Sequence, residues 1–408
     1  MYIKRHLEEQ VLKASEDYPV IMVCGQRQVG KSTMLYHIKE DDRRYVTFDD
    51  VNARNLAETD VGLFFETYGE KLLIDEVQRV PSILIEIKRI VDEKALKGEE
   101  NAGMFWLTGS QKFRMMQGVA ESLAGRVAVF DMASLSAAEI DGKPYCEFSA
   151  EIHDLKEMAR SCDKKTLRQV YERIWRGGMP KLYSSDVSRD RYYADYINTY
   201  LERDVKDLAQ VGKLNDFYNF LVYLAARTAQ ELKYDEAARS IGVSAPTIRA
   251  WVTILERSGI ITLIKPYSEN LTKIIVKTPK MYFTDTGLCA YLCRYPNAET
   301  LENSAMDGAI LETYVVSELL KNRYNGGKIP DLYYYRDKDR REIDIIIPVA
   351  DKLYPIEIKK SKTPAHPTKN FDVLIKTGKE IATGLIICFA DEVIPYDRSA
   401  YYCPVWLI

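Results

Sequence analysis

The segment Val20–Leu35 constrains the fold of this chain more than any other stretch of the sequence. It opens with an apolar, β-branched run, Val20–Val23, that has the length of a strand. Gly25 through Ser32 then spells G-x-x-x-x-G-K-S, and a helix-like segment follows. The two glycines permit backbone angles closed to other residues, so successive N–H groups can turn inward around phosphate oxygens. The segment predicts a phosphate-binding loop between a strand and a helix.

Such a loop is expected to bind a nucleoside triphosphate together with Mg²⁺. The helix beginning near Lys31 adds its positive dipole end to the phosphate site. Lys31 is expected to reach the β- and γ-phosphates, and the Ser32 hydroxyl to ligate Mg²⁺. The predicted nucleotide-binding residues are Gly25, Gln26, Arg27, Gln28, Val29, Gly30, Lys31, Ser32 and Thr33.

Length and composition limit the remaining possibilities. A chain of 408 residues can form two or three domains, each with its own core. Its formal net charge of −3 means that any contact with nucleic acid must come from local basic patches. The cysteines and histidines show no metal-binding spacing. No apolar run approaches the roughly 18 residues of a membrane span, and Met1–Glu9 is too charged for a secretory signal, so we expect a cytoplasmic protein without a membrane partner.

A second motif follows the short apolar run Leu72–Ile74, which reads as a buried strand. Asp75 and Glu76 lie at its carboxyl end, where open parallel sheets bind their ligands. Asp75 is therefore expected to hold Mg²⁺, mostly through water. Glu76 is expected to polarise the attacking water as a general base. About fifty residues after a phosphate loop, this acidic pair is a strong indication.

Two later positions carry weaker predictions. Met104–Gln111 reads as another buried strand running into polar residues, where Ser110 either senses the γ-phosphate or forms a turn. Arg126 lies between a helical segment and an apolar strand. An arginine there either stabilises transition-state charge in a neighbouring subunit or forms an ordinary surface ion pair.

These motifs resemble the archaeal-type P-loop ATPases of the AAA+ and signal-transduction ATPase assemblage. The resemblance is carried by Gly25–Thr33, Leu72–Gln78, Leu107–Gln111 and Leu123–Val127. More narrowly, nearly the whole chain is similar to bacterial and archaeal ATPases with a restriction-endonuclease-like end. It departs from them at Gln26, where proline is usual, and at Cys24, where a small or polar residue is common. The resemblance implies ATP as the nucleotide and Arg126 as a candidate arginine finger, hence a homo-oligomer.

The middle of the chain, from Gly142 to Ala226, is helical in pattern and rich in tyrosine. Its long predicted helix spans Tyr193–Leu208. Similar ATPases carry segments comparable to Arg176–Pro180 and Glu202–Asp204. We expect a lid over the nucleotide and a linker, and we assign no chemistry to these residues.

A winged helix-turn-helix is predicted next. Tyr234–Ser240 and Ala245–Ser258 read as two helices around a glycine-centred turn, with Ser244 as the N-cap of the second helix and Gly259 at its end. Two β-rich stretches follow, Ile260–Lys265 and Lys273–Lys277.

The second of these helices would enter a major groove if the domain binds DNA. Thr247, Arg249 and Arg257 lie on it. Residues 228–280 hold eight basic and five acidic side chains, a net charge of +3, which is modest for a DNA-binding domain. Winged helices also serve as spacers between proteins, so both roles remain open.

The far end of the chain carries a second constellation of polar residues. Glu312 lies on an amphipathic helix, Gly308–Arg323, and two strands follow, Arg341–Ile347 and Leu353–Lys359. Because side chains alternate across a strand, pairing these strands as a hairpin brings Asp344, Glu357 and Lys359 to one side. Two carboxylates that converge make a hard-oxygen site for Mg²⁺, and the lysine could orient a water or stabilise negative charge.

This arrangement resembles the restriction-endonuclease-like PD-(D/E)xK core. The resemblance implies Asp344, Glu357 and Lys359 as catalytic residues, with Glu312, Asp344 and Glu357 as metal ligands. Two alternatives stay open: a solvated hairpin with cross-strand salt bridges, and a core of this fold that no longer cuts. From Lys352 to Lys379, seven lysines face two acids, which suggests a patch that follows a phosphate backbone.

The sequence thus predicts a multidomain α/β protein. Its expected parts are a P-loop parallel-sheet AAA+-like ATPase at 1–142, a helical lid and linker at 143–226, a winged helix-turn-helix at 227–285 and a nuclease-like domain at 286–408. The first functional hypothesis is an ATP-hydrolysing, DNA-associated enzyme with a Mg²⁺-dependent nuclease. The second is an ATP-gated switch whose nuclease-like end only binds DNA or a protein partner. In a third, the winged helix mediates oligomerisation and touches no nucleic acid.

Overall fold

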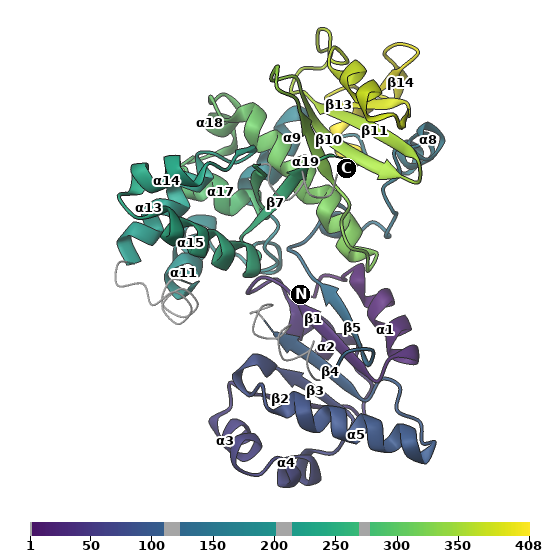
Figure 1. Ribbon diagram of the computed structural model, residues 1–408, viewed down its shortest axis with the longest axis vertical. Helices are drawn as coiled ribbons and strands as arrows, with labels where there is room; N and C mark the ends of the chain where they lie inside the picture. The colour runs from purple at the N-terminus through teal and green to yellow at the C-terminus, as the bar shows by residue number, and fades with distance from the viewer. Residues whose placement is uncertain (1, 110–122, 201–213, 269–277) are drawn as a thin grey trace.

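The computed structural model describes residues 2–109, 123–200, 214–268 and 278–408. Two β-sheets organise these residues, one of five strands and one of ten. Figure 1 shows the smaller sheet in the lower, purple and blue part of the molecule. The larger sheet lies in the upper part, drawn in green and yellow.

The N-terminal sheet is parallel throughout, with the strand order β2-β3-β4-β1-β5. Every residue of β1, β3 and β4 is buried, as expected for central strands of a parallel sheet covered on both faces. β1 lies between β4 and β5, so the loop leaving its carboxyl end opens where the strand order reverses, the usual ligand position in such sheets. The predicted parallel-sheet domain is confirmed. Its strands are β1 (Val20–Cys24), β2 (Arg44–Thr47), β3 (Leu72–Asp75), β4 (Phe105–Gly109) and β5 (Val127–Asp131).

Helices cover the two faces of this sheet because alternate residues of β1 point to opposite sides. Ile21 and Val23 belong to the cluster that contains helices α1 and α2, whereas Met22 and Cys24 belong to the cluster of α3, α4 and α5. The helices are α1 (Leu7–Asp17), α2 (Lys31–Ile38), α3 (Val51–Thr59), α4 (Val61–Tyr68) and α5 (Ile83–Lys97), with a single 3-10 turn η1 (Val77–Arg79).

The predicted tyrosine-rich segment is helical in its described residues. Tyr192, Tyr193, Tyr196 and Tyr200 are all buried along α11, where their rings supply apolar area and their hydroxyls can bond across the core. Glu202–Asp204 lies outside the described residues. The helices are α7 (Ala137–Ile140), α8 (Ile152–Ser161), α9 (Leu167–Arg176), α10 (Lys181–Ser184), α11 (Arg189–Tyr200) and α13 (Leu214–Ala225).

The larger sheet runs through two of the predicted domains. Its order is β14-β15-β13-β11-β10-β9-β7-β8-β6, with β12 beside β11. The parallel pairing of β7 with β9 joins Lys265 to Tyr333 and Pro266 to Tyr334. The border expected at residue 285 therefore divides a single sheet. Its strands are β6 (Gln230–Glu231), β7 (Ile261–Pro266), β8 (Lys280–Phe283), β9 (Tyr333–Arg336), β10 (Glu342–Val349), β11 (Lys352–Ile358), β12 (Glu380–Ile381), β13 (Gly384–Cys388), β14 (Ile394–Pro395) and β15 (Ala400–Pro404).

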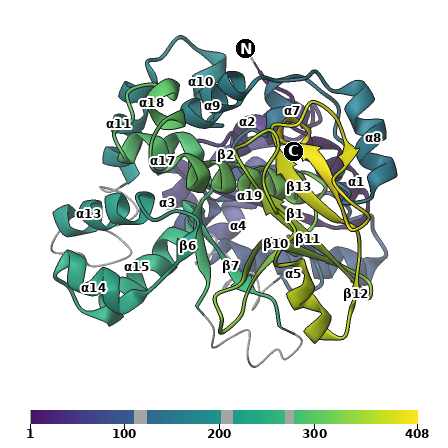
Figure 2. The ribbon, with the colours of Figure 1, turned by 90° about the horizontal axis from the view of Figure 1, so that it is seen from above.

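Two helices, α14 and α15, lie at the positions that the pattern predicts, with a turn between them. The Ser244 side chain accepts a hydrogen bond from the N–H of Thr247 at the start of α15. Gly242 in the preceding turn has a φ of +81°. β7 pairs antiparallel with β8, and the predicted strand Lys273–Lys277 lies outside the described residues. Figure 2 shows α13, α14 and α15 extending to one side of the sheet. The remaining helices are α14 (Tyr234–Ile241), α15 (Ala245–Arg257), α17 (Thr286–Leu292), α18 (Ala298–Glu302) and α19 (Asp307–Asn325), with 3-10 turns η3 (Phe371–Thr377) and η4 (Val405–Leu407).

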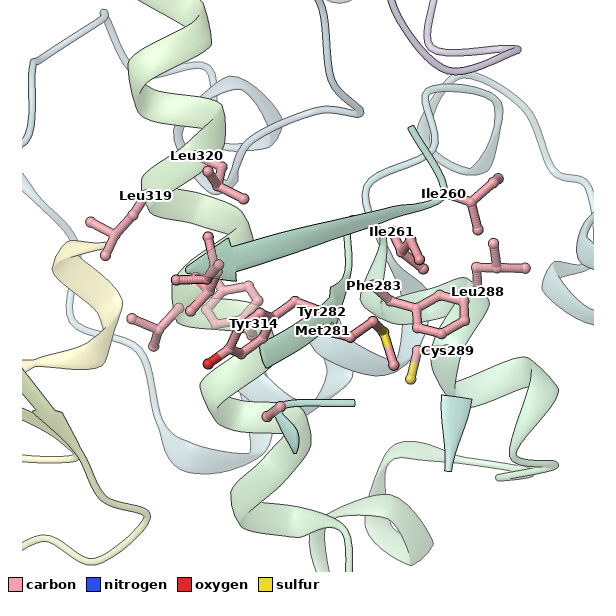
Figure 3. Packing of buried hydrophobic residues seen from close by; sticks show 14 of the residues in the cluster. Ile260, Ile261, Met281, Tyr282, Phe283, Leu288, Cys289, Tyr314, Leu319 and Leu320 are labelled. Carbon is pink, nitrogen blue, oxygen red and sulfur yellow. The ribbon is translucent and has the colours of Figure 1, made fainter. Parts of the chain in front are cut away.

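One apolar cluster connects the two halves of the molecule. It extends from Leu7 of α1 to Leu311 of α19 and Ile356 of β11. Figure 3 shows its centre around β8, with Met281 and Phe283 near Leu288 and Cys289 of α17. The buried position of Cys289 agrees with a packing role for this residue.

Among the residues that the structure describes, none of the helices has both the length and the apolar content to cross a bilayer.

Candidate functional site

The phosphate loop has the backbone geometry that its glycines predict. Gly25 has a φ of +150° and Gly30 a φ of +95°. A Cβ atom at Gly25 would lie 2.1 Å from the carbonyl oxygen of Met132, so no other residue fits there. Gly30 is the N-cap of α2, the helix whose amino end faces the site.

Lys31 is folded back onto the loop. Its Nζ donates to the carbonyl oxygens of Gly25 at 2.9 Å and Gln26 at 2.8 Å. The side chain is buried, and burial lowers the pKa of Lys31 while the Glu76 carboxylate opposes that shift. A buried ammonium held by only two carbonyls is a strong partner for an arriving anion.

The Asp75 carboxylate accepts hydrogen bonds from three other elements, α2, β4 and β2. Ser32 donates to its Oδ1 at 2.5 Å, and the hydroxyl of Thr108 on β4 donates to the same oxygen. Tyr45 on β2 donates to Oδ2 at 3.1 Å, and burial together with the Asp75 charge raises the pKa of Tyr45 to about 12. Sequence reasoning missed Thr108 and Tyr45, although each lies on a strand that pairs with β3.

Glu76 has a conformation that is uncommon for a residue other than glycine. Its φ is +57°, and strained backbones of this kind cluster at functional sites. Its N–H donates to the Thr108 hydroxyl at 3.3 Å, and the Gln78 amide donates to its carboxylate. Glu76 therefore borders the same cavity as Lys31.

A cavity of about 570 Å³ lies over the phosphate loop, within the usual size of small-ligand sites. Seven of the predicted residues, Arg27 through Thr33, line it. The predicted lid segment contributes Pro180, Lys181, Ser184 and Thr199 to the lining. The N-terminal segment contributes Tyr2 and Arg5, which the sequence did not indicate.

Gly25 and Gln26 line a second cavity, of about 320 Å³, on the other side of the loop. The Gln26 amide donates to the Tyr196 hydroxyl of α11 at 2.8 Å. A Cβ atom at Gly259, just after α15, would lie 3.5 Å from the Gln26 backbone nitrogen. Gln26 thus connects the phosphate loop to α11 and to the residue that follows α15.

The glycine pair in the lid is explained by close packing. A Cβ atom at Gly177 would lie 2.6 Å from Oδ1 of Asp285, and one at Gly178 would lie 2.5 Å from the Leu135 carbonyl oxygen. Asp285 is buried and accepts hydrogen bonds from the Gly178 N–H and the Tyr193 hydroxyl, each at 2.7 Å. These contacts fix the segment that leads into Pro180 at the nucleotide cavity.

The two remaining predicted residues of the ATPase part are Ser110 and Arg126. Ser110 lies outside the described residues. Arg126 pairs with Asp92 of α5 through two hydrogen bonds, at 2.5 and 3.0 Å. The ion-pair alternative for Arg126 therefore has direct structural support within this chain.

The side chains proposed for DNA contact on α15 lie against other groups of this chain. Arg249 stacks over the ring of Tyr234 at 4.4 Å, and Arg257 lines the second cavity beside Gln26. Thr247 shares a hydrogen bond of 2.8 Å with Ser244.

The lysine-rich patch predicted between Lys352 and Lys379 is neutralised at five positions. Its ion pairs are Lys352–Glu380, Lys359–Glu357, Lys360–Asp307, Lys362–Asp391 and Lys379–Asp351.

The C-terminal hairpin forms in the predicted register. Ile345 pairs with Ile356, so Asp344 and Glu357 lie on the same face. Lys359 Nζ lies 2.5 Å from Glu357 Oε2 and 3.5 Å from Asp344 Oδ2. The structure thus brings the three predicted catalytic side chains together. Burial and the Asp344 charge raise the pKa of Glu357 to about 8, although Lys359 opposes this.

Glu312 is held by partners that the sequence did not indicate. Lys280 of β8 donates to its Oε1 at 2.9 Å, and the Tyr282 hydroxyl donates to the same oxygen at 2.7 Å. Burial raises the pKa of Glu312 to about 7, against the opposing charge of Lys280. No local pattern in the sequence marks Lys280, because its burial depends on elements that are distant in sequence.

The predicted metal ligands differ in how well they fit an ion. Ser32 and Asp75 offer a hydroxyl and a carboxylate side by side, which are oxygen donors suited to Mg²⁺. At the C-terminal site the expected set is Glu312, Asp344 and Glu357, but Glu312 is bonded to an ammonium group. Within the described residues, no group of three or more His, Cys, Asp and Glu side chains is arranged to hold a metal. The C-terminal set does not fit a metal ion as it stands.

Comparisons with known proteins match three regions of the chain. Residues 17–141 match a family model described as an AAA domain. Residues 167–299 and 307–408 match two domains of unknown function, DUF8612 and DUF4143. The first region contains the phosphate loop, Asp75 and Glu76, so the N-terminal part is a P-loop ATPase-like domain of the AAA type.

Whole-chain relatives have no assigned activity. Uncharacterized proteins of Mycobacterium bovis and Mycobacterium tuberculosis are each 26% identical over 368 residues, which span 89% of this chain and 75% of theirs. Among solved structures, the Walker-type ATPase of Pyrococcus abyssi is 15% identical with a TM-score of 0.41, covering 71% of this chain and 96% of that one. AMPPCP-bound DnaA of Aquifex aeolicus is 14% identical with a TM-score of 0.28, covering 61% and 85%. Neither structural likeness is close enough to support an assignment of function.

Proposed function

We propose that this protein binds and hydrolyses ATP, and that the nucleotide state changes the contacts between its ATPase part and its C-terminal half. The observation that carries the proposal is that Lys31 and Ser32 line one cavity within the AAA-type region, with Asp75 hydrogen-bonded to Ser32. All three groups have the chemistry that a triphosphate with Mg²⁺ requires.

Each residue has a role that follows from its contacts. Lys31 exchanges the carbonyls of Gly25 and Gln26 for phosphate oxygens, because a charged partner binds an ammonium more strongly than a neutral one. Ser32 would ligate Mg²⁺ and Asp75 would hold it mostly through water, and the bound ion would neutralise phosphate charge. Thr108 fixes the rotamer of Asp75. Glu76 accepts a proton from the attacking water.

Gln26 supplies the connection to the rest of the molecule. Gln26 packs closely against Gly259, and its side-chain amide bonds to Tyr196. When Lys31 releases the Gln26 carbonyl, Gln26 is free to move relative to both partners. Both contacts lie outside the ATPase sheet, one in the lid and one at the end of α15. A two-state change at the loop would therefore bias the position of the winged helix.

Phosphate release and hydrogen exchange on the full chain test this function together. We expect Mg²⁺-dependent release of phosphate from ATP, and protection of α15 that differs between ATP and no nucleotide. Gln26→Ala should preserve ATP binding within a few-fold and abolish the difference at α15. Gln230→Ala, at an exposed glutamine of β6, is the matched control. Absence of nucleotide binding at millimolar ATP with magnesium would refute the proposal.

Phosphodiester cleavage by the C-terminal domain is a second candidate function. It is supported by the convergence of Asp344, Glu357 and Lys359 on one face of the hairpin. The ion pair of Glu312 with Lys280 favours instead the alternative in which this end only binds DNA or a protein partner. Incubation of plasmid and single-stranded DNA with Mg²⁺ or Mn²⁺ distinguishes them. Cleavage that disappears in Asp344→Ala and Lys359→Ala would support a nuclease, and equal inactivity of all three proteins would support the binding role.

A further inference from the structure

Lys280 is a buried lysine in a strand that the nucleotide site does not use. Its side chain is 3% exposed, and it lies at the start of β8, between the helix-turn-helix and α17. Burying an unpaired ammonium is strongly unfavourable, so its position requires compensating charge. That charge comes from two carboxylates: Glu312 on α19, at 2.9 Å, and Glu342 on β10, at 2.5 Å.

These two acids belong to a larger carboxylate cluster, which we define as Glu312, Glu342, Asp344 and Glu357. Lys359 pairs with Glu357 and Asp344 at the other end of the cluster. Glu312 and Asp344 also accept from neutral donors, the Tyr282 hydroxyl at 2.7 Å and the backbone N–H of Ile358 at 2.8 Å. Arg336 lies 3.7 Å from Glu342. The charge on both ends of the cluster is therefore compensated by lysines of this same chain.

We propose that Lys280 is the resident cation of the carboxylate cluster: its ammonium takes the place beside Glu312 where a nuclease-like core would carry a divalent ion. A divalent ion needs about six oxygen ligands around it. Here the Oε1 atom of Glu312 is already shared by Lys280 and Tyr282. No divalent ion enters beside Glu312 while Lys280 is in place. This inference does not depend on ATP hydrolysis.

The strand that carries Lys280 is separated in sequence from the acids that it neutralises. β8 pairs with β7 and β6 on its two edges, which fixes the backbone of Lys280 in the ten-stranded sheet. Glu312 and Glu342 lie on α19 and β10, in the part of the chain that follows β8. Lys280 therefore joins two segments of the chain through its ion pairs.

Binding of Mn²⁺ to the nucleotide-free full chain, followed by electron paramagnetic resonance, tests the proposal. Lys280→Met should gain one site per chain, bound at least tenfold more tightly than any Mn²⁺ in the wild type, and Glu312→Gln added to that variant should remove it. Lys280→Arg keeps the positive charge and should gain nothing. Lys265→Met, at an exposed lysine of the neighbouring β7, should also gain nothing. A folded Lys280→Met protein without a new site would overturn the proposal.

A comparison that does not need the Lys280 variant to fold completes the test. The wild type and Glu312→Gln should bind Mn²⁺ identically in the absence of nucleotide, because Glu312 has no metal to lose. Wild-type binding that Glu312→Gln weakens would show that a metal ion, and not Lys280, is the cation of the cluster.

Discussion

The hydroxyl of Ser32, in the first turn of α2, donates a 2.5 Å hydrogen bond to Oδ1 of Asp75 at the end of β3. The strands that lead to these residues, β1 and β3, are not neighbours, because β4 lies between them. Thr108 of β4 donates to the same carboxylate oxygen, so the strand between β1 and β3 also contacts Asp75. The nucleotide site is thus preorganised by three adjacent strand ends.

The first prediction concerns nucleotide affinity. Lys31→Met should weaken ATP binding about 100-fold, or about 2.7 kcal/mol, because it removes the buried cation of the cavity. Ser32→Ala should mainly remove the contribution of Mg²⁺ to affinity. Fluorescence anisotropy of a labelled ATP analogue, with and without Mg²⁺, measures both. Lys39→Met, at a half-buried lysine just after α2, is the control. Affinity retained in Lys31→Met would exclude the loop as the phosphate site.

A second prediction separates binding from hydrolysis. Glu76→Gln keeps the shape of the side chain but cannot accept a proton, so ATP should bind within about twofold of the wild type. Phosphate release should fall about 100-fold to 10,000-fold, the usual contribution of a general base. Glu66→Gln, at an exposed glutamate of α4, should leave turnover unchanged. Full turnover in Glu76→Gln would assign the base to another residue.

The sequence predicted those features of the fold and the site that depend on local order. Gly25 and Lys31 are recognisable because their spacing within one loop decides their function. Asp75 and Glu76 are recognisable because they end a buried strand. The β10–β11 hairpin was predicted in register because its alternation fixes which face Asp344 and Glu357 share.

Contacts between distant elements could not be predicted in this way. Thr108 and Tyr45 reach Asp75 only because of the strand order β2-β3-β4, which no local pattern encodes. The pairing of β7 with β9 is equally remote in sequence, and it joins two segments predicted as separate domains. Lys280 reads as an ordinary lysine until Glu312 and Glu342 are placed around it.

The third prediction concerns the two glycines of the lid. Gly177→Ala and Gly178→Ala should each destabilise the protein by about 2 kcal/mol or more, because the added methyl would overlap Asp285 and Leu135 atoms. Gly177 also has a φ of +80°, which strains any other residue. Urea denaturation followed by tryptophan fluorescence measures the change. Gly308→Ala, in open space within α19, should be neutral or slightly stabilising.

The fourth prediction tests the two interpretations of Arg126. If the pair with Asp92 is its role, Arg126→Ala and Asp92→Ala should cause similar losses of stability, of at most about 1 kcal/mol, and turnover should stay within about twofold. An arginine finger would instead lose about 1,000-fold or more in turnover for Arg126→Ala alone. Mixing Arg126→Ala with Lys31→Met chains would then restore activity, because each variant supplies what its neighbour lacks.

The last prediction concerns pH and the buried pair of Arg5 and Glu139. Arg5 donates to Glu139 at 3.0 Å and to the Val29 carbonyl of the phosphate loop at 2.7 Å. Burial alone would raise the pKa of Glu139, but the Arg5 charge and the N–H groups of Ser136 and His6 bring its pKa below the usual value. The stabilisation is therefore complete above about pH 4.5 and is lost as the pH falls through the folded-state pKa.

Glu139→Gln isolates this contribution. The amide leaves Arg5 buried without its counter-charge, so the free energy of unfolding at pH 7 should fall by about 3 kcal/mol. The difference between variant and wild type should shrink as the pH falls through the folded-state pKa of Glu139, because the wild-type carboxylate then also becomes neutral. Glu172→Gln removes an exposed helical ion pair with Arg168 and should show no such pH dependence. Arg5 also donates to the Val29 carbonyl of the phosphate loop. A Glu139→Gln protein with normal stability but weaker ATP binding would contradict the stability prediction. It would show that the Arg5–Glu139 pair positions the phosphate loop without stabilising the fold.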